Sequence, residues 1–260
     1  MAVKSLSILP VGRCGVANWM LDTRLQGTEA GRPIVELPVW VYLIETTDGP
    51  ILIDSGMPDE CIGRPDLLAD PDHPEESPEI VPQMGAGDSI VSALARAKLA
   101  PNDLLCLVST HWHFDHAGGN RHFPETRVVV QRTEYESFFS LATEEQSEAF
   151  WITSDLRYDF VDGDVELVPG VHLISTPGHS PGHQSVLVST PQSGNVLLTI
   201  DAAYTGLNYE EGIPFTVIDE GMTRLSIQKL KYIAKDEHAF VFYGHDTVQA
   251  KSVRPFPAHY

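Results

Sequence analysis

Short hydrophobic runs recur along the chain, each bounded by residues that favour turns. Two of them, PVWVYLIET (38–46) and PILID (50–54), flank a turn with Asp48 and Gly49 at its tip, which is typical of a β-hairpin. The N-terminal residues predict a first strand. Six further runs have the length and the β-branched content of strands: LLCLVST (104–110), TRVVVQ (126–131), VHLIST (171–176), SVLVST (185–190), NVLLTID (195–201) and FVFYGH (240–245).

Two segments between these strands show helical spacing. The segment 88–100 begins with Asp88 as a candidate N-cap, and the segment 222–235 repeats apolar residues at steps of three to five. The expected buried positions are Ile90, Leu94 and Ala97 in the first helix and Met222, Leu225, Leu230 and Ile233 in the second. Hairpins mixed with helices favour a layered α/β fold over a strictly alternating parallel sheet.

The stretch 54–88 is the most irregular part of the chain and is rich in Pro, Asp and Glu. Connections of this length inside a domain tend to be functional or mobile. A linker between two domains is the alternative, but similar strand-like runs continue on both sides. We therefore expect one domain spanning residues 1–260.

The charge balance narrows the class of partner. Seventeen Lys and Arg against 36 Asp and Glu give a formal net charge of −19. This charge repels phosphate backbones and anionic lipid surfaces, so neither nucleic-acid nor membrane binding is expected. Three cysteines without CxxC spacing, and an N-terminus lacking the apolar core of a secretory signal, favour a cytoplasmic protein.

Five of the predicted strands are each followed within a few residues by a histidine or an aspartate. These residues are Asp54, His111, His179, Asp201 and His245. If the strands lie in packed sheets with these ends at one edge, the side chains converge on a single rim, where α/β folds place their chemistry. Strands ending in polar loops would explain any one of these residues, but not all five together.

The motif HWHFDH (111–116) adds ligand-type side chains to this rim. Imidazole and carboxylate are the ligand set of zinc-like divalent ions. His111 and His113 alternate and can face one ion, while Asp115 and His116 fall beyond the bend and can face a second. A single tetrahedral ion cannot use so many ligands, but a pair of ions can. His179 and His245 would complete one site each, with Asp201 bridging.

The remaining six histidines are expected to be structural or exposed: His73, His122, His172, His183, His238 and His259. His183 is the closest competitor, because GHSPGH (178–183) offers two candidates. His179 is preferred because it lies nearer to the end of the preceding strand.

A rival mechanism lies in the same segment. GHSPG (178–182) matches the G-x-S-x-G nucleophile elbow, and Ser180, Asp201 and His245 follow in the chain order of an α/β-hydrolase triad. The elbow requires a helix directly after the serine, whereas the residues that follow predict a strand. A serine hydrolase would also leave the histidines of 111–116 without a role.

The motif THWHFDHAGG (110–119) resembles the H-x-H-x-D-H signature of the metallo-β-lactamase superfamily. More narrowly, HFDHAGGN, VVVQRTEYE, TPGHSPGHQS and LLTIDAAYT resemble the N-acyl homoserine lactonases, which are quorum-quenching enzymes. The resemblance extends from PVWVYLIETTDGPILIDSGMP to FYGHD, which is nearly the whole chain. The six-residue signature is specific for the superfamily but not for the substrate, so another lactone or a glyoxalase II-like thioester stays open.

This resemblance implies an α/β fold of the αββα sandwich type with a dinuclear metal centre, most simply of two Zn²⁺ ions. His111, His113 and His179 would hold one ion, Asp115, His116 and His245 the other, and Asp201 would bridge them. Asp54 resembles the family's carboxylate that orients a ligand histidine. The implied assembly is a monomer or a homodimer.

The implied reaction is hydrolysis of the lactone ring of an N-acyl homoserine lactone. A hydroxide held between the ions attacks the carbonyl carbon, and Tyr204 helps to stabilise the oxyanion. Asp115 is expected to protonate the leaving alkoxide, unless it acts as a ligand only. Phe114 is expected to line the acyl pocket and Trp112 to pack beneath the motif. A metal-binding scaffold without turnover is the non-enzymatic alternative.

Overall fold

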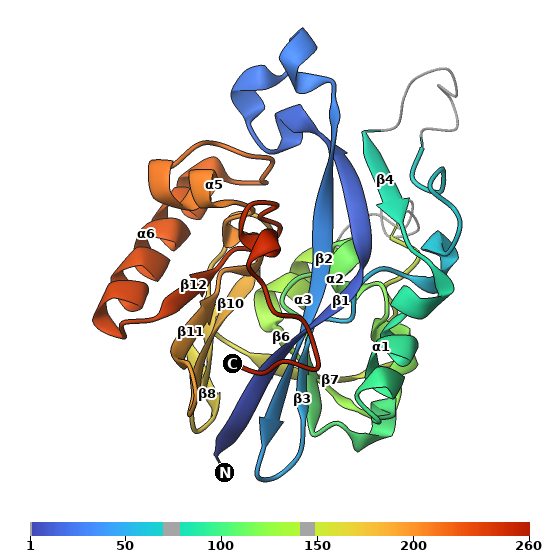
Figure 1. Cartoon of the computed structure of the whole chain (residues 1–260), viewed down its shortest axis with the longest axis vertical. Helices are drawn as coiled ribbons and strands as arrows, with labels where there is room; N and C mark the ends of the chain where they lie inside the picture. Colours follow the sequence, from blue (N-terminus) through green and yellow to red (C-terminus); the bar gives the residue numbers. More distant parts are fainter. Residues whose placement is uncertain (1, 70–78, 141–148) are drawn as a thin grey trace.

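The computed structural model describes residues 2–69, 79–140 and 149–260. Two β-sheets face each other, and helices cover both outer faces (Figure 1). The larger sheet has the strand order β4-β1-β2-β3-β5-β6-β7 and the smaller β12-β11-β10-β9-β8. This layering is the predicted αββα sandwich.

Alternation along the strands explains how the sheets pack. In β2 (Ile34–Thr46), Val39, Val41 and Leu43 face the helix-covered side, whereas Tyr42 and Ile44 face the second sheet. Successive side chains of a strand point to opposite faces, so one strand supplies two hydrophobic layers. The layer between the sheets is completed from the smaller sheet by Val171, Leu173, Val186, Val188, Val196 and Leu198.

The larger sheet begins with a long antiparallel pair and continues with parallel strands. β1 (Val3–Ala17) pairs with β2, and β3 (Ile51–Ile53) closes the predicted hairpin against β2. The parallel part is β5 (Cys106–Val108), β6 (Arg127–Gln131) and β7 (Arg157–Val161). β4 (Ile80–Gln83), from the irregular stretch 54–88, pairs with β1 at the other edge. The described end of that stretch therefore adds an edge strand that the sequence did not reveal.

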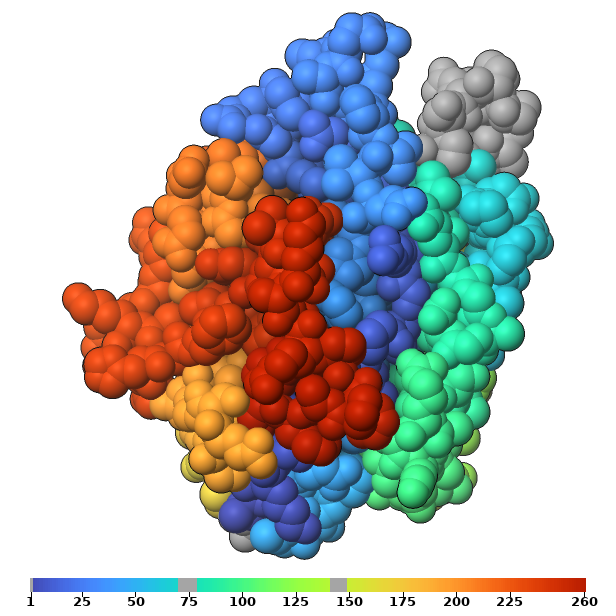
Figure 2. All heavy atoms as spheres, viewed as in Figure 1, coloured from blue at the N-terminus to red at the C-terminus, as the bar shows by residue number. Residues whose placement is uncertain are grey.

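The smaller sheet is a meander with one parallel addition. β8 (Val165–Val168), β9 (Val171–Ser175), β10 (Gln184–Thr190) and β11 (Gly194–Leu198) run antiparallel, and β12 (Phe240–Phe242) joins β11 in parallel. The C-terminal residues then return to β1, where Tyr260 and Leu6 exchange backbone hydrogen bonds of 2.8 and 3.2 Å. In Figure 2 this red segment lies between the halves of the molecule.

Both predicted helices are present, with corrected details. α1 is Ile90–Arg96, and its N-cap is Ser89, whose hydroxyl accepts from the Ser92 N–H at 3.2 Å. Asp88 is not the cap, because its carboxylate accepts from the Gly85 N–H at 2.8 Å instead. Ile90 and Leu94 are buried against the larger sheet as expected.

The long helix α6 (Glu220–Asp236) covers the smaller sheet with a face that matches the prediction in part: Leu230 is buried and Ile233 packs against the same cluster, but Met222 and Leu225 are exposed. Leu225 is 59% and Met222 40% exposed, whereas the buried residues are Thr223, Ser226, Ile227 and Leu230. At about 100° per residue, the five-residue step from Leu225 to Leu230 turns the helix by about 140° beyond one full turn. Leu225 and Leu230 therefore cannot share one buried face.

Three shorter helices lie near the strand ends: α2 (Phe114–Ala117), α3 (Arg132–Phe139) and α5 (Gly206–Glu211). Among the described residues, no helix is long and apolar enough to cross a membrane. α2 begins at Phe114, inside the HWHFDH motif. The motif therefore starts in the connection after β5 and becomes helical from its fourth residue.

Candidate metal centre

The structure brings the seven predicted donor residues together at one end of the two sheets. They form two groups of potential ligand atoms: a first donor group of His111, His113, His179 and Asp201, and a second donor group of Asp115, His116 and His245. The motif 111–116 follows β5, and the other donors follow β9, β11 and β12. The predicted convergence on one rim is therefore a feature of the fold.

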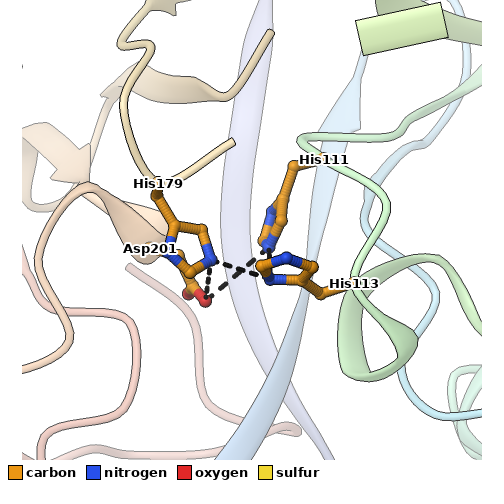
Figure 3. Close-up of side chains that lie close together, drawn as sticks. All are labelled: His111, His113, His179 and Asp201. Atoms are coloured by element: carbon orange, nitrogen blue, oxygen red, sulfur yellow. Dashed lines mark hydrogen bonds and ion pairs between the residues drawn. The ribbon is translucent and has the colours of Figure 1, made fainter. Parts of the chain in front are cut away.

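In the first donor group, nitrogens point at one another across short distances (Figure 3). His113 Nδ1 lies 3.2 Å from His111 Nε2 and 2.8 Å from His179 Nε2. Asp201 Oδ2 lies 3.2 Å from His179 Nε2 and 3.7 Å from His111 Nε2. His111 and His179 are buried, and His113 is the more exposed member.

The second donor group is built in the same way. His116 Nε2 and His245 Nε2 are 3.3 Å apart, and Asp115 Oδ2 lies 3.7 Å from each of them. Asp201 Oδ1 lies 3.2 Å from His116 Nε2 and 3.0 Å from His245 Nε2. Asp201 thus faces the first group with one carboxylate oxygen and the second group with the other.

Asp54, which belongs to neither donor group, orients two of these histidines through hydrogen bonds. Its Oδ2 accepts from His116 Nδ1 at 2.9 Å and from the Thr110 hydroxyl at 2.8 Å, and its Oδ1 accepts from the Thr110 N–H at 2.8 Å. Because the Thr110 hydroxyl donates to Asp54, its oxygen accepts from His111 Nδ1 at 3.2 Å. One buried carboxylate therefore sets the tautomer of His116 directly and that of His111 through Thr110.

In the neutral form of these rings, the hydrogen bonds place the proton on the outward nitrogen and leave the inward nitrogen without one. His111, His116 and His245 each donate from Nδ1 outward, the last to the Pro38 carbonyl at 2.8 Å. In neutral imidazole the other nitrogen then carries a lone pair. The Nε2 lone pairs of His116 and His245, and the carboxylate of Asp201, all point into one buried space, where they repel one another unless a cation lies between them.

The electrostatics lead to the same conclusion. Burial holds the pKa of His111 well below its ordinary value, so this ring is neutral. Burial is the largest single influence on His116 and His245 and opposes their protonation, but the carboxylates of Asp201 and Asp115, with their hydrogen bonds, together outweigh it and raise both pKa values. The site thus favours positive charge between its nitrogens and carboxylate oxygens, and this donor set fits two divalent cations.

A cavity of about 350 Å³ opens above the donors. Five of the donor residues belong to its lining: His113, Asp115, His179, Asp201 and His245. The rest of its wall is mainly apolar: Cys14, Val16, Met20, Leu37, Ile80, Phe114, Trp151, Val217 and Ile218. Phe114 is a predicted wall residue, and Met20 comes from the segment after β1. An apolar chain attached to a polar head group fits such a cavity.

Comparisons with known proteins agree with this arrangement. Residues 34–245 match the metallo-β-lactamase superfamily. The N-acyl homoserine lactonase AiiA of Bacillus thuringiensis subsp. kurstaki is 44% identical, with both chains covered in full. The chain belongs to the N-acyl homoserine lactonases.

Solved structures of such lactonases superpose on the whole chain. An N-acyl homoserine lactone hydrolase with N-hexanoyl-L-homoserine at its catalytic metal centre has a TM-score of 0.92 at 44% identity, with both chains fully covered. A variant of the B. thuringiensis AiiA with N-decanoyl-L-homoserine bound at its active site has the same TM-score at 43% identity, also over both full chains. The αββα architecture of this lactonase is therefore that of its family.

Tyr204 of this lactonase lies on the cavity wall beside both donor groups. Its ring centroid is 5.4 Å from that of His179 and 5.5 Å from that of His245, and the Phe215 ring supports it at 4.7 Å. Burial, and then the carboxylates of Asp201 and Asp115, raise the pKa of Tyr204 well above its ordinary value. The phenol therefore keeps its proton and is available as a hydrogen-bond donor.

His183, the competitor of His179, belongs to neither donor group. Its Nδ1 donates to Thr176, and its Nε2 accepts from the Asp201 N–H at 3.1 Å. His183 thus supports the backbone of Asp201. Among the other excluded histidines, His122 pairs with Asp59, His259 bonds Ser7, and His172 and His238 lie away from the centre; His73 lies outside the described residues.

Ser180 has no geometry for nucleophilic attack. Its hydroxyl is buried and donates to Glu134 Oε2 at 2.8 Å, and β10 rather than a helix follows the GHSPGH segment. The triad partners Asp201 and His245 instead face each other within the metal centre. The wall residues Trp151, Val217 and Ile218, and the buried Glu134, were not found from the sequence, because no local pattern marks them.

Proposed function

We propose that the chain is a dinuclear metal hydrolase that opens the lactone ring of N-acyl homoserine lactones and so acts in quorum quenching. In this proposal His111, His113 and His179 would hold one ion, Asp115, His116 and His245 would hold the other, and Asp201, whose two oxygens face the two groups, would serve both. The ions are two Zn²⁺, which favour this nitrogen and oxygen ligand set. The observation that carries the proposal is a two-group donor set whose members His113, Asp115, His179, Asp201 and His245 line a cavity with a mainly apolar remaining wall.

The polar and the apolar part of the substrate bind to different parts of the cavity wall. The polar lactone lies against the donors, and the acyl chain runs along the apolar wall that includes Met20, Phe114 and Ile218. Transferring apolar surface from water onto such a wall contributes roughly 0.8 kcal/mol per buried CH₂ group. The same burial excludes water from the reacting end, which strengthens every electrostatic interaction there.

The chain supplies two groups for the proton and charge changes of hydrolysis. The bound ions supply Lewis acidity and lower the pKa of water, which provides a nucleophile near neutral pH. Tyr204, which keeps its proton, donates a hydrogen bond to the oxygen that gains charge as the carbonyl carbon becomes tetrahedral. Asp115, which lines the same cavity, would accept the proton of the hydroxyl group added to the carbonyl carbon and pass it to the alkoxide released by ring opening, so that a carboxylate and an alcohol result. The product is the open N-acyl homoserine.

The proposal also includes the cellular compartment and the assembly of the enzyme. All three cysteines have free, buried thiols, and burial raises the pKa of Cys106 to about 11 and of Cys61 to about 12. Such unreactive thiols suit a reducing compartment and support a cytoplasmic location. Both donor groups come from one chain, acting as a single domain, so a monomer or a homodimer would carry complete sites.

A substrate panel tests this function. Metal-stripped and zinc-reconstituted protein is assayed with N-hexanoyl and N-decanoyl homoserine lactone, γ-butyrolactone and a glutathione thioester, and ring opening is followed by proton release. We expect kcat/KM for the homoserine lactones to exceed that for the thioester by at least about 100-fold, because their acyl chain binds the apolar wall while the lactone lies at the metal centre. A preference for the thioester, or no loss of activity after metal removal, would contradict the proposal.

A further inference from the structure

Besides Asp54, a second buried carboxylate outside the two donor groups bonds residues next to the candidate ligands. Glu134 is in the first turn of α3 and is only 5% exposed. A buried carboxylate is costly unless it is well hydrogen-bonded. Glu134 meets this requirement with three donors: the Trp112 N–H at 3.0 Å to Oε1, and the Ser180 hydroxyl at 2.8 Å and the Gly182 N–H at 2.7 Å to Oε2.

The three donors to Glu134 flank the histidines of the first donor group. Trp112 lies between His111 and His113, and Ser180 directly follows His179. Glu134 therefore contacts no donor imidazole through a hydrogen bond, but it bonds the chain immediately next to all three of them.

Glu134 also joins parts of the chain that belong to different sheets. The Trp112 loop follows β5 of the larger sheet, whereas Ser180 and Gly182 lie in the connection from β9 to β10 of the smaller sheet. The shortest contact within the first donor group, 2.8 Å between His113 Nδ1 and His179 Nε2, spans the same two loops. One carboxylate thus sets the separation of the loops whose histidines must meet.

The packing around Glu134 is built for close approach. A Cβ atom at Gly182 would lie 2.2 Å from the Glu134 nitrogen, so only glycine allows this loop to reach α3. On the other loop, the Trp112 ring packs edge-on against Phe138 and Phe139 of α3, at centroid distances of 5.4 and 5.7 Å. Both loops are therefore seated on α3 as well as bonded to Glu134.

We infer that Glu134 is a positioning residue for the first donor group: by accepting from the Trp112 N–H, the Ser180 hydroxyl and the Gly182 N–H, it holds the two loops that carry His111, His113 and His179 and sets the affinity and geometry of that site without touching the metal. This inference rests on the dinuclear centre of the proposed function. It assigns Glu134 to the first group and leaves the second group to Asp54. Loss of Glu134 should therefore weaken one of two metal-binding steps and spare the other.

The test compares Glu134→Gln with a matched control on the same helix. A glutamine at this position turns an NH₂ group toward at least one of the donors, so at least one main-chain N–H loses its acceptor. Glu136→Gln makes the same charge change at an exposed position of α3. Ser180→Ala removes one of the three bonds and serves if Glu134→Gln fails to fold.

Three quantities are measured on full-length protein: the melting temperature of the metal-free form, the two stepwise zinc affinities in competition with a chromophoric chelator, and the visible spectrum with Co²⁺. For Glu134→Gln we expect one binding step to weaken by about 10- to 100-fold, the range typical of lost outer partners of metal ligands, and the other to stay within about threefold. The Co²⁺ spectrum changes with it. Ser180→Ala gives a smaller loss at the same step, and Glu136→Gln matches the wild type.

Two outcomes would overturn the inference. One is that neither step changes in Glu134→Gln; the other is that both steps weaken together in proportion to a lower melting temperature, which would make Glu134 a general stability residue. If the wild type itself binds fewer than two ions, the proposed dinuclear function is contradicted. If the wild type binds two ions and Glu134→Gln binds them equally well, only the inference about Glu134 is contradicted.

Discussion

The two donor groups share Asp201 and lie side by side, but the protein holds them by different means. In the second group, Asp54 bonds the imidazole of His116 itself, which fixes the ring and its tautomer. In the first group, Glu134 bonds main-chain and hydroxyl donors next to the ligands, which fixes the loops. Only His111 belongs to both arrangements, because Asp54 reaches it through Thr110. A ligand can thus be aimed through its ring or through its backbone.

The largest effect is expected from Asp201→Asn, which breaks both groups at once. Each carboxylate oxygen of Asp201 faces a different group, and an amide nitrogen cannot replace an oxygen ligand. We expect kcat/KM to fall by about 1,000-fold or more, because several kcal/mol of metal-based stabilisation is lost. Steady-state kinetics with metal analysis measures this; a protein that retains two ions and loses less than tenfold would contradict a bridging role.

Tyr204→Phe separates chemistry from metal binding, since it leaves both groups intact. Removing the phenol donor should lower kcat by about 100-fold, the typical cost of losing one donor to a developing oxyanion. Metal content, measured by elemental analysis, should stay at the wild-type value. An unchanged kcat would show that Tyr204 only packs against Phe215 and His179.

Asp54→Asn sharpens the comparison from the side of the second group. The amide presents NH₂ to either His116 Nδ1 or Thr110, so at least one bond becomes a donor–donor contact. We expect the zinc affinity of the second group to fall by about 10- to 100-fold. Chelator competition run beside Glu134→Gln should show losses at opposite steps. Identical profiles for the two variants would remove the distinction between the groups.

Thr110→Val is the mildest test and probes the one link between the two arrangements. Valine keeps the shape and the backbone bond to Asp54 but leaves His111 Nδ1 without its acceptor. We expect the zinc affinity of the first group to fall by at most about tenfold and that of the second group to stay unchanged. A loss confined to the second group would mean that Thr110 serves mainly to orient Asp54.

The sequence predicts the strands and the convergence of the candidate donor residues because both follow from local patterns. Period-two alternation marks β2, and the donors stand in a short motif or directly after a strand end, so sheet geometry alone brings them together. The predicted face of α6 is confirmed at Leu230 and Ile233 and wrong at Met222 and Leu225, because the apolar spacing was counted loosely; Leu225 is exposed while Thr223 and Ser226 are buried. Polar residues on the buried side of a helix are invisible to an apolar count.

Glu134 shows what sequence patterns cannot supply. On a helix such as Arg132–Phe139, a glutamate is ordinarily expected on the face exposed to solvent. Its partners are two main-chain N–H groups and one hydroxyl from loops that lie far apart in the chain. The cavity wall is similar: Trp151 and Ile218 reach the site through long-range packing alone. Such roles follow from the tertiary arrangement and not from any residue type.

Each donor group draws on both halves of the chain, and this has a consequence for how the enzyme is made. Residues 111–116 precede the smaller sheet, whereas His179, Asp201 and His245 depend on strands as late as β12. On the ribosome, the first group cannot close before β11 has been synthesised, and the second cannot close before β12 has been synthesised. Under the proposed function, the complete centre therefore stabilises only a chain that has reached its last strand. A lactonase produced in a zinc-starved cell would lack this stabilisation and would be the form that proteases degrade first.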